Sequence, residues 1–167
     1  MSKVGKKFPD ISVNAMNEMG DTFKINVLQE ALENKKKIIL FWYPKDFTFV
    51  CPTEIHAFQS KLSEFEKRNT MVIGASCDTP EVHLAWRSTP KDNGGIEGVT
   101  FPLIADSTRH LSETLDILDS VYVGTEENYS IEGDNVSYRA TFLIDEEGTI
   151  FHESVNVMPL GRNVDEY

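Results

Sequence analysis

The chain contains three short, continuous apolar runs, and this feature restricts its possible folds more than any other. The runs are KIILFWY (37–43), TMVIGAS (70–76) and FPLIAD (101–106). Runs of this length without polar alternation are typical of strands that are covered on both faces of a sheet. Between the first two runs, apolar residues recur at spacings of three, four and three, which predicts one face of an amphipathic helix. These residues are Ile55, Phe58, Leu62 and Phe65.

Two further helices are expected after the second and third runs. Thr79 and Pro80 are typical of a helix start, and the helix is expected to continue through Trp86. A third helix is predicted over 111–118. Strands that alternate with helices in this way predict an α/β domain with a mixed central sheet flanked by helices.

The ends of the chain have the pattern of hairpins. Residues 11–25 predict a small N-terminal hairpin around a Gly-Asp turn, and residues 138–155 predict a second hairpin that turns at Glu147 and Gly148. Residues 119–137 are acidic and polar, and we expect a surface loop there. No linker composition divides the chain, so residues 1–167 are expected to form a single domain.

Composition excludes several classes of function. The formal net charge is −11, from 16 basic and 27 acidic residues, which disfavours nucleic acid and anionic membranes as partners because both would repel the protein. No apolar stretch approaches the ~20 residues that span a bilayer, and the N-terminus lacks a signal-peptide core. We therefore expect a cytoplasmic protein. Two cysteines without a CxxC pair argue against a disulfide scaffold and a dithiol site.

One of the two cysteines, Cys51, lies where chemistry is commonly found in α/β proteins. In the stretch FWYPKDFTFVCPTE it follows a strand and precedes Pro52, which suits the first turn of a helix. A helix N-terminus stabilises an anion such as a thiolate by about 0.3–1 kcal/mol, so a nearby cation is expected as well. Thr48 is expected on the same helix face, where its hydroxyl can bind the sulfur or a substrate oxygen. Pro44 would shape the loop and shield the sulfur.

The segment PKDFTFVCPTE (44–54) resembles the active-site loop of the peroxiredoxins, with the pattern Pro-x-x-x-(Thr/Ser)-x-x-Cys. The wider stretch is similar to the typical two-cysteine branch, of the bacterial alkyl hydroperoxide reductase C type. HLAW (83–86), FPLIAD (101–106), YRATFLID (138–145) and PLGRNVDE (159–166) extend the resemblance over almost the whole chain. It implies a thioredoxin-like fold and a peroxidase that reduces hydrogen peroxide and organic hydroperoxides.

The resemblance also implies roles for individual residues. Cys51 would attack the O–O bond as a thiolate and become a sulfenic acid, while Arg139 would hold the thiolate and polarise the peroxide. Thr48 would bind the peroxide oxygens, and Pro44 would screen the site. Supporting roles in orientation or packing fall to Glu54 and Trp86. The resemblance implies no metal, haem or flavin, and the four scattered histidines do not have the spacing of a zinc site.

Several points depart from the family pattern or stay open. Two-cysteine relatives resolve the sulfenic acid with a second cysteine near the C-terminus, and we expect that the C-terminal helix and tail are missing from this chain. Glu97 replaces the last glycine of a Gly-Gly-Leu-Gly motif, and Phe151 stands where some relatives have a second arginine. Cys77 ends an apolar strand and is expected to be structural.

The partners implied by the resemblance are a small hydroperoxide substrate and an external reductant. The reductant could be a thiol protein such as thioredoxin or a flavoprotein of the alkyl hydroperoxide reductase F type. A homodimer, or a decamer built from such dimers, is expected. The alternative is a redox relay or a holdase chaperone on the same scaffold, and turnover with a reductant would distinguish these from a peroxidase.

Overall fold

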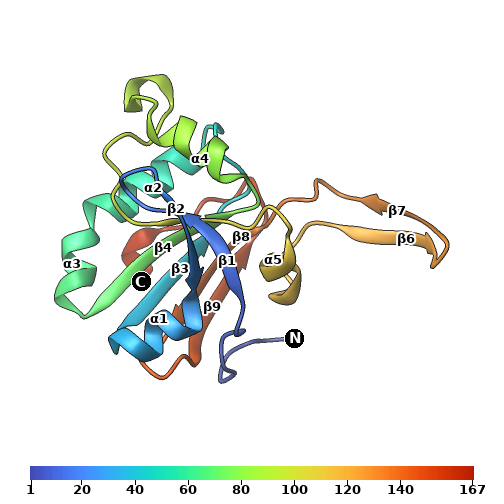
Figure 1. Cartoon of the computed structure of the whole chain (residues 1–167), viewed down its shortest axis with the longest axis horizontal. Helices are drawn as coiled ribbons and strands as arrows, with labels where there is room; N and C mark the ends of the chain where they lie inside the picture. The colour runs from blue at the N-terminus through green and yellow to red at the C-terminus, as the bar shows by residue number, and fades with distance from the viewer.

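The computed structural model describes residues 1–167 and contains a seven-stranded mixed sheet with helices on both faces (Figure 1). The strand order is β2-β1-β5-β4-β3-β8-β9. The central strands β3, β4 and β5 are parallel, whereas β8 runs antiparallel to β3 and β1 runs antiparallel to β5. The strands of this sheet are β1 (Ser12–Met16), β2 (Thr22–Asn26), β3 (Lys37–Trp42), β4 (Thr70–Ser76), β5 (Leu103–Ala105), β8 (Arg139–Ile144) and β9 (Ile150–Asn156).

The helices divide between the two faces of the sheet. Helix α1 packs its buried Ala31 into the core on one face, together with Leu111 of α5. On the other face, α2, α3 and α4 contribute Phe58, Phe65 and Trp86 to a second core. The helices are α1 (Val27–Asn34), α2 (Cys51–Ser60), α3 (Leu62–Lys67), α4 (Pro80–Arg87) and α5 (His110–Thr114), with 3-10 turns η1 (Lys91–Asn93) and η2 (Val164–Glu166). No helix has both the length and the apolar character needed to cross a membrane.

The burial of both faces of strand β3 explains why its sequence is apolar without alternation. Ile38, Leu40 and Trp42 point into the first core, and Ile39 and Phe41 point into the second. All five are at most 2% exposed, so both faces of the strand are covered, as its sequence predicted. The predicted α/β architecture and both terminal hairpins are confirmed.

Two helix predictions need correction. The apolar stripe after Cys51 belongs to two helices, α2 and α3, because Lys61 leaves the helical conformation (φ −100°, ψ 2°) between them. The helix predicted over 111–118 ends at Thr114. Asp116 adopts a left-handed conformation (φ 58°), and Leu118 forms an isolated bridge with Ser137, so the chain cannot continue as a helix.

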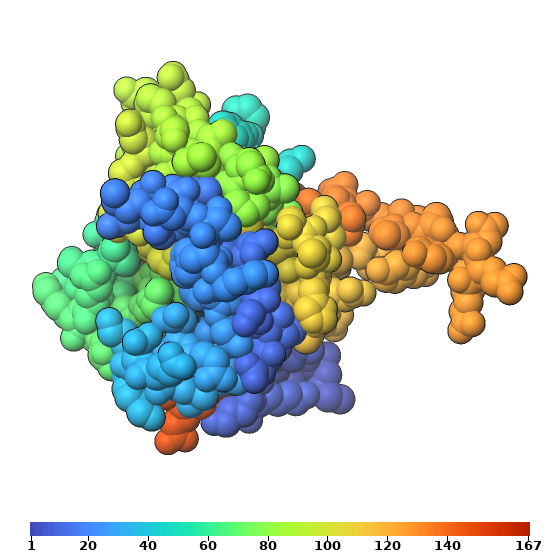
Figure 2. Space-filling view, viewed as in Figure 1, coloured from blue at the N-terminus to red at the C-terminus, as the bar shows by residue number.

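The prediction of a surface loop at residues 119–137 is also wrong. This segment forms a separate two-stranded sheet of β6 (Val121–Thr125) and β7 (Asn128–Glu132), which projects from the body as an arm (Figures 1 and 2). Tyr122 pairs with Ile131 across the two strands, and its ring centroid lies 5.5 Å from that of Tyr129. Every residue of both strands is exposed, so the cross-strand pairs rather than a core define the arm.

Candidate active site

Cys51 is the first residue of α2 and lies at the carboxyl end of the parallel strands, one loop after β3. The helix begins here because Pro52 fits its first turn and Thr53 donates its hydroxyl hydrogen to the carbonyl of Val50 (2.7 Å). The cysteine is free and its side chain is fully buried. Cys51 therefore occupies the first turn of a ten-residue helix, where backbone N–H groups lack intrahelical partners, as the sequence predicted.

Arg139 supplies the cation beside this sulfur. It is the first residue of β8, and its Nη1 lies 3.3 Å from Sγ of Cys51. The same nitrogen donates to Oε2 of Glu54 at 2.8 Å, while Nε donates to the carbonyl of Met158. Only 4% of the Arg139 side chain is exposed. The guanidinium is thus held from two sides, with one N–H group directed at the sulfur.

Glu54 joins Arg139 to a second arginine, Arg162. Its Oε1 accepts hydrogen bonds from the backbone N–H (2.8 Å) and Nε (3.1 Å) of Arg162. Arg162 also donates to the carbonyls of Trp42 and Ala140, so its guanidinium bridges β3 and β8. The orienting position expected for Glu54 thus corresponds to a buried carboxylate between two buried guanidinium groups.

Sequence reasoning missed Arg162 as part of the site. It lies in the quoted PLGRNVDE segment, but its contact with Glu54 spans 108 positions, and no local spacing could reveal that contact. Phe151, which stands at the position where the family pattern led us to look for a second arginine, lies on β9 and is 48% exposed.

The charges of this cluster favour an anionic sulfur. Two guanidinium groups and one carboxylate are buried together, and they leave one uncompensated positive charge. Burying an unpaired charge is costly, and an anion at the position of Sγ would remove that cost. The arrangement therefore suits a thiolate at Cys51.

The loop before Cys51 differs in detail from the expectation. Thr48 precedes the helix, so it does not share a helix face with Cys51, and its hydroxyl donates to the carbonyl of Lys45 (3.3 Å). The reason is the left-handed conformation of Phe47 (φ 57°), which turns the chain before α2 begins. Pro44 is buried, and the shielding role expected for it stays a prediction.

Trp86 lies in the core below this loop. Its side chain is fully buried, its indole N–H donates to the carbonyl of Gly94 (2.8 Å), and its ring centroid lies 5.8 Å from that of Tyr43. These contacts fit the packing role expected for it. The hydrogen bond also ties α4 to the segment that contains Glu97, whose own side chain is exposed.

Cys77 lies apart from this arrangement. It is 7% exposed, and its sulfur lies 3.7 Å from the hydroxyl oxygen of Ser112. Burial raises the pKa of the Cys77 thiol above its ordinary value, which favours the protonated, unreactive form. The environment of Cys77 is the one expected for a structural cysteine.

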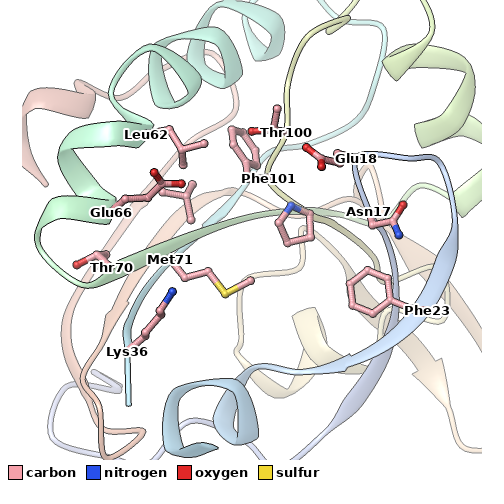
Figure 3. A pocket seen from close by; sticks show the side chains of 12 residues that line it. Asn17, Glu18, Phe23, Lys36, Leu62, Glu66, Thr70, Met71, Thr100 and Phe101 are labelled. Carbon is pink, nitrogen blue, oxygen red and sulfur yellow. The ribbon is translucent and has the colours of Figure 1, made fainter. Parts of the chain in front are cut away.

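A surface cavity lies apart from Cys51. A cavity of about 420 Å³ lies beside Phe23, Met71 and Phe101, with Lys36 and Glu18 at its rim (Figure 3). None of its lining residues belongs to the arginine cluster. The sulfur of Cys51 is instead covered, so any molecule that reaches it must be small or must enter while the loop moves.

The mixed sheet with flanking helices is a thioredoxin-like fold, and it carries a free cysteine at a strand–helix junction. The sequence pattern of the AhpC/TSA family matches residues 4–153, and the chain belongs to this family. The peroxiredoxin resemblance and the thioredoxin-like fold are thereby confirmed.

Individual relatives agree with this assignment. The chain is 42% identical over 163 residues to the chloroplastic 2-Cys peroxiredoxin BAS1 of Spinacia oleracea, covering 98% of this chain and 56% of the spinach protein. It is 39% identical over 166 residues to alkyl hydroperoxide reductase C of Helicobacter pylori, covering 99% and 75%. Thus the chain spans little more than half the length of the spinach relative.

Solved structures give the same result. The reduced 2-Cys peroxiredoxin of Plasmodium vivax superposes with a TM-score of 0.85 at 36% identity, covering 99% of this chain and 78% of the other. AhpC of Enterococcus faecalis superposes with a TM-score of 0.83 at 29% identity, covering 99% and 88%.

Proposed function

We propose that the protein is a thiol-dependent peroxidase that reduces hydrogen peroxide and organic hydroperoxides through a sulfenic acid at Cys51. The observation that carries this proposal is the approach of the Arg139 guanidinium to 3.3 Å from a buried sulfur at a helix N-terminus. Helix end and guanidinium together stabilise a thiolate, which is the nucleophilic form of cysteine.

The chemistry balances without a cofactor. The Cys51 thiolate attacks one oxygen of ROOH, the S–O bond forms, and the O–O bond breaks. The sulfur loses two electrons to give S–OH, and the leaving RO⁻ takes up a proton as ROH. An external thiol then displaces the sulfenic oxygen as water and forms a mixed disulfide, which a second thiol reduces to regenerate Cys51.

Each residue around the sulfur has a proposed part in this reaction. Arg139 stabilises the charge that moves from sulfur to the leaving oxygen, while Glu54 and Arg162 fix its orientation. Thr48, whose hydroxyl donates to the Lys45 carbonyl in this structure, would turn to bind a peroxide oxygen. Pro44 keeps bulk water away from the sulfur.

The recycling partner and the assembly belong to the same proposal. One solved relative, from Plasmodium yoelii, is named a thioredoxin peroxidase, which supports a thiol-protein reductant such as thioredoxin. A flavoprotein of the alkyl hydroperoxide reductase F type is the other candidate. We also propose a homodimer formed through β9, an edge strand that exposes Phe151 and Val155, and a cytoplasmic location.

A single-turnover experiment tests the peroxidase without requiring a reductant. One equivalent of hydrogen peroxide should add one oxygen to the parent protein by mass spectrometry, and Cys51→Ser should lose this product. Cys77→Ser is the matched control and should be oxidised at the parent rate. Peroxide consumption by Cys51→Ser at that rate would refute the assignment. The relay and holdase alternative is not favoured, because the relatives are named as peroxiredoxins and alkyl hydroperoxide reductases.

A further inference from the structure

A buried polar cluster lies beneath the loop that leads to Cys51. Asp46 in this loop is 5% exposed, and His83 of α4 is fully buried. Oδ2 of Asp46 lies 2.7 Å from Nδ1 of His83, and Oδ1 accepts a hydrogen bond from the hydroxyl of Tyr43 at 2.8 Å. The Nε2 atom of His83 lies 2.9 Å from the carbonyl oxygen of Ile104. Every polar atom of the two side chains therefore has a partner.

The hydrogen-bond partners determine how many protons Asp46 and His83 hold together. The carbonyl of Ile104 can only accept, so Nε2 of His83 carries a hydrogen. A hydrogen bond between Nδ1 and Oδ2 then requires one further proton, on either the imidazole or the carboxyl group. Without that proton, a nitrogen lone pair would face a carboxylate oxygen in a buried site. The geometry thus requires Asp46 and His83 to share one proton.

The hydrogen bonds of Asp46 anchor the loop that leads to Cys51. The neighbouring residues Lys45 and Phe47 are exposed, so Asp46 is the inward anchor of this turn. Its backbone N–H donates to Asp78 (2.8 Å), which follows β4, and its carboxyl group binds α4 through His83. The loop between Pro44 and Cys51 is therefore fastened at Asp46 to two elements of the body.

We propose that Asp46 and His83 are positioning residues, which hold the loop before Cys51 through one shared proton and release it when that proton is lost at alkaline pH. A metal ion does not explain the group, although ligand atoms of Asp46, Asp78 and His83 lie within 4.8 Å of one another. The 2.7 Å contact between Nδ1 and Oδ2 is a direct hydrogen bond that leaves no space for an ion between these atoms.

Charges around the pair favour retention of the proton. Burial alone would lower the pKa of His83, but the hydrogen bond and charge of Asp46 outweigh it, and the His83 pKa is raised above 6.5. Burial raises the pKa of Asp46, and the nearby Asp78 adds to the increase. Tyr43 has a pKa well above its ordinary value because of burial and Asp46, so it remains a donor. The cation of Arg87 on α4 acts in the opposite direction, because its interaction with Tyr43 and Asp46 favours the anionic forms of these groups.

The sign of the pH effect follows from linkage. An unfolded histidine loses its proton near pH 6.5, whereas the folded pair keeps it to a higher pH. The stability that this proton provides is complete below pH ~6.5 and is lost as pH rises through the raised His83 pKa. Within that window the folded-to-unfolded ratio falls by up to about tenfold per pH unit.

The decisive variant is Asp46→Asn. The amide oxygen can accept from Tyr43, and the amide N–H₂ can donate to Nδ1 of a neutral His83, so the contact persists without a shared proton. We expect parent protein to show a transition above pH 6.5 in tryptophan fluorescence, because the exposed Phe47 ring lies 6.0 Å from Trp86 and moves with the loop. Asp46→Asn should lack this transition and the associated loss of stability in urea unfolding.

The matched control is His56→Asn. His56 lies 3.1 Å from the Gly95 carbonyl and has no carboxylate partner, so its replacement should leave the alkaline transition unchanged. Persistence of the transition in Asp46→Asn would overturn the proposal, as would its loss in His56→Asn. The inference rests on the proposed function only for its kinetic consequence, a parallel fall in the rate of Cys51 oxidation. Fluorescence and unfolding require no peroxide chemistry, so failure of either proposal can be recognised separately.

Discussion

Neutralising Glu54 should destabilise the protein strongly, because this carboxylate is buried between two cations. Its oxygens accept hydrogen bonds from Arg139 at 2.8 Å and from Arg162 at 2.8 and 3.1 Å. In Glu54→Gln, the side chain keeps its shape but one oxygen becomes an NH₂ group. Whichever way the amide turns, a donor then faces the N–H groups of an arginine.

The size of this effect follows from burial. Only 4% of the Glu54 side chain is exposed, and the partner side chains are 4% and 1% exposed. Removal of one partner from a buried ion pair costs about 3–5 kcal/mol, because the remaining charge is left uncompensated. For a domain of this size, that loss lowers the melting temperature by about 6–20 °C.

A matched control exists one helix later in the chain. Glu64 also pairs with two cations, Lys67 at 2.9 Å and Arg68 at 3.0 Å, but its side chain is 48% exposed. Because exposed pairs contribute little, Glu64→Gln should unfold almost as the parent does. The assay is urea unfolding followed by circular dichroism, with both variants and the parent in the same buffer. Equal midpoints for Glu54→Gln and the parent would refute the reasoning from burial.

Three further outcomes are expected. Gly74→Ala should destabilise the protein by about 1–3 kcal/mol in urea unfolding, because its Cβ would lie 2.8 Å from Cδ2 of Leu103; an unchanged midpoint would contradict this packing. Trp86→Phe leaves the carbonyl of Gly94 without its indole donor, and should cost at least about 1 kcal/mol by the same measurement. Replacement of residues 120–133 by a short glycine link should preserve both the unfolding midpoint and the rate of Cys51 oxidation, because the exposed arm contributes nothing to either core.

Local sequence was sufficient to predict where Cys51 lies in the fold. Strand β3 has to be apolar on both faces, and Pro52 fits only the first turn of a helix, so Cys51 could be placed at their junction. The arginine at position 139 could be assigned only through the family motif, since 88 positions separate it from the cysteine. Its geometry confirms the expected proximity, while its catalytic role stays a prediction.

The features that sequence reasoning missed depend on contacts between distant segments or on single backbone angles. Arg162 contacts Glu54 only after the chain has returned from β9. The left-handed angle at Phe47 removes Thr48 from the helix face, and Lys61 interrupts a helix whose apolar stripe continues without a break. The polar composition of the arm predicts a loop, because the pairing of Tyr122 with Ile131 has no core behind it and leaves no apolar pattern in the sequence.

The anchoring of the arm has a practical consequence. At its base, Asp119 accepts hydrogen bonds from the backbone of Asn135 and the hydroxyl of Tyr138, at 2.9 Å each. Because these bonds hold the base of the arm in place, movement of the tip at residues 126–127 is not transmitted to Arg139, which follows the arm in the same stretch of chain. A fluorophore or photo-crosslinker attached at the tip would therefore report what the protein encounters in solution without disturbing the sulfur.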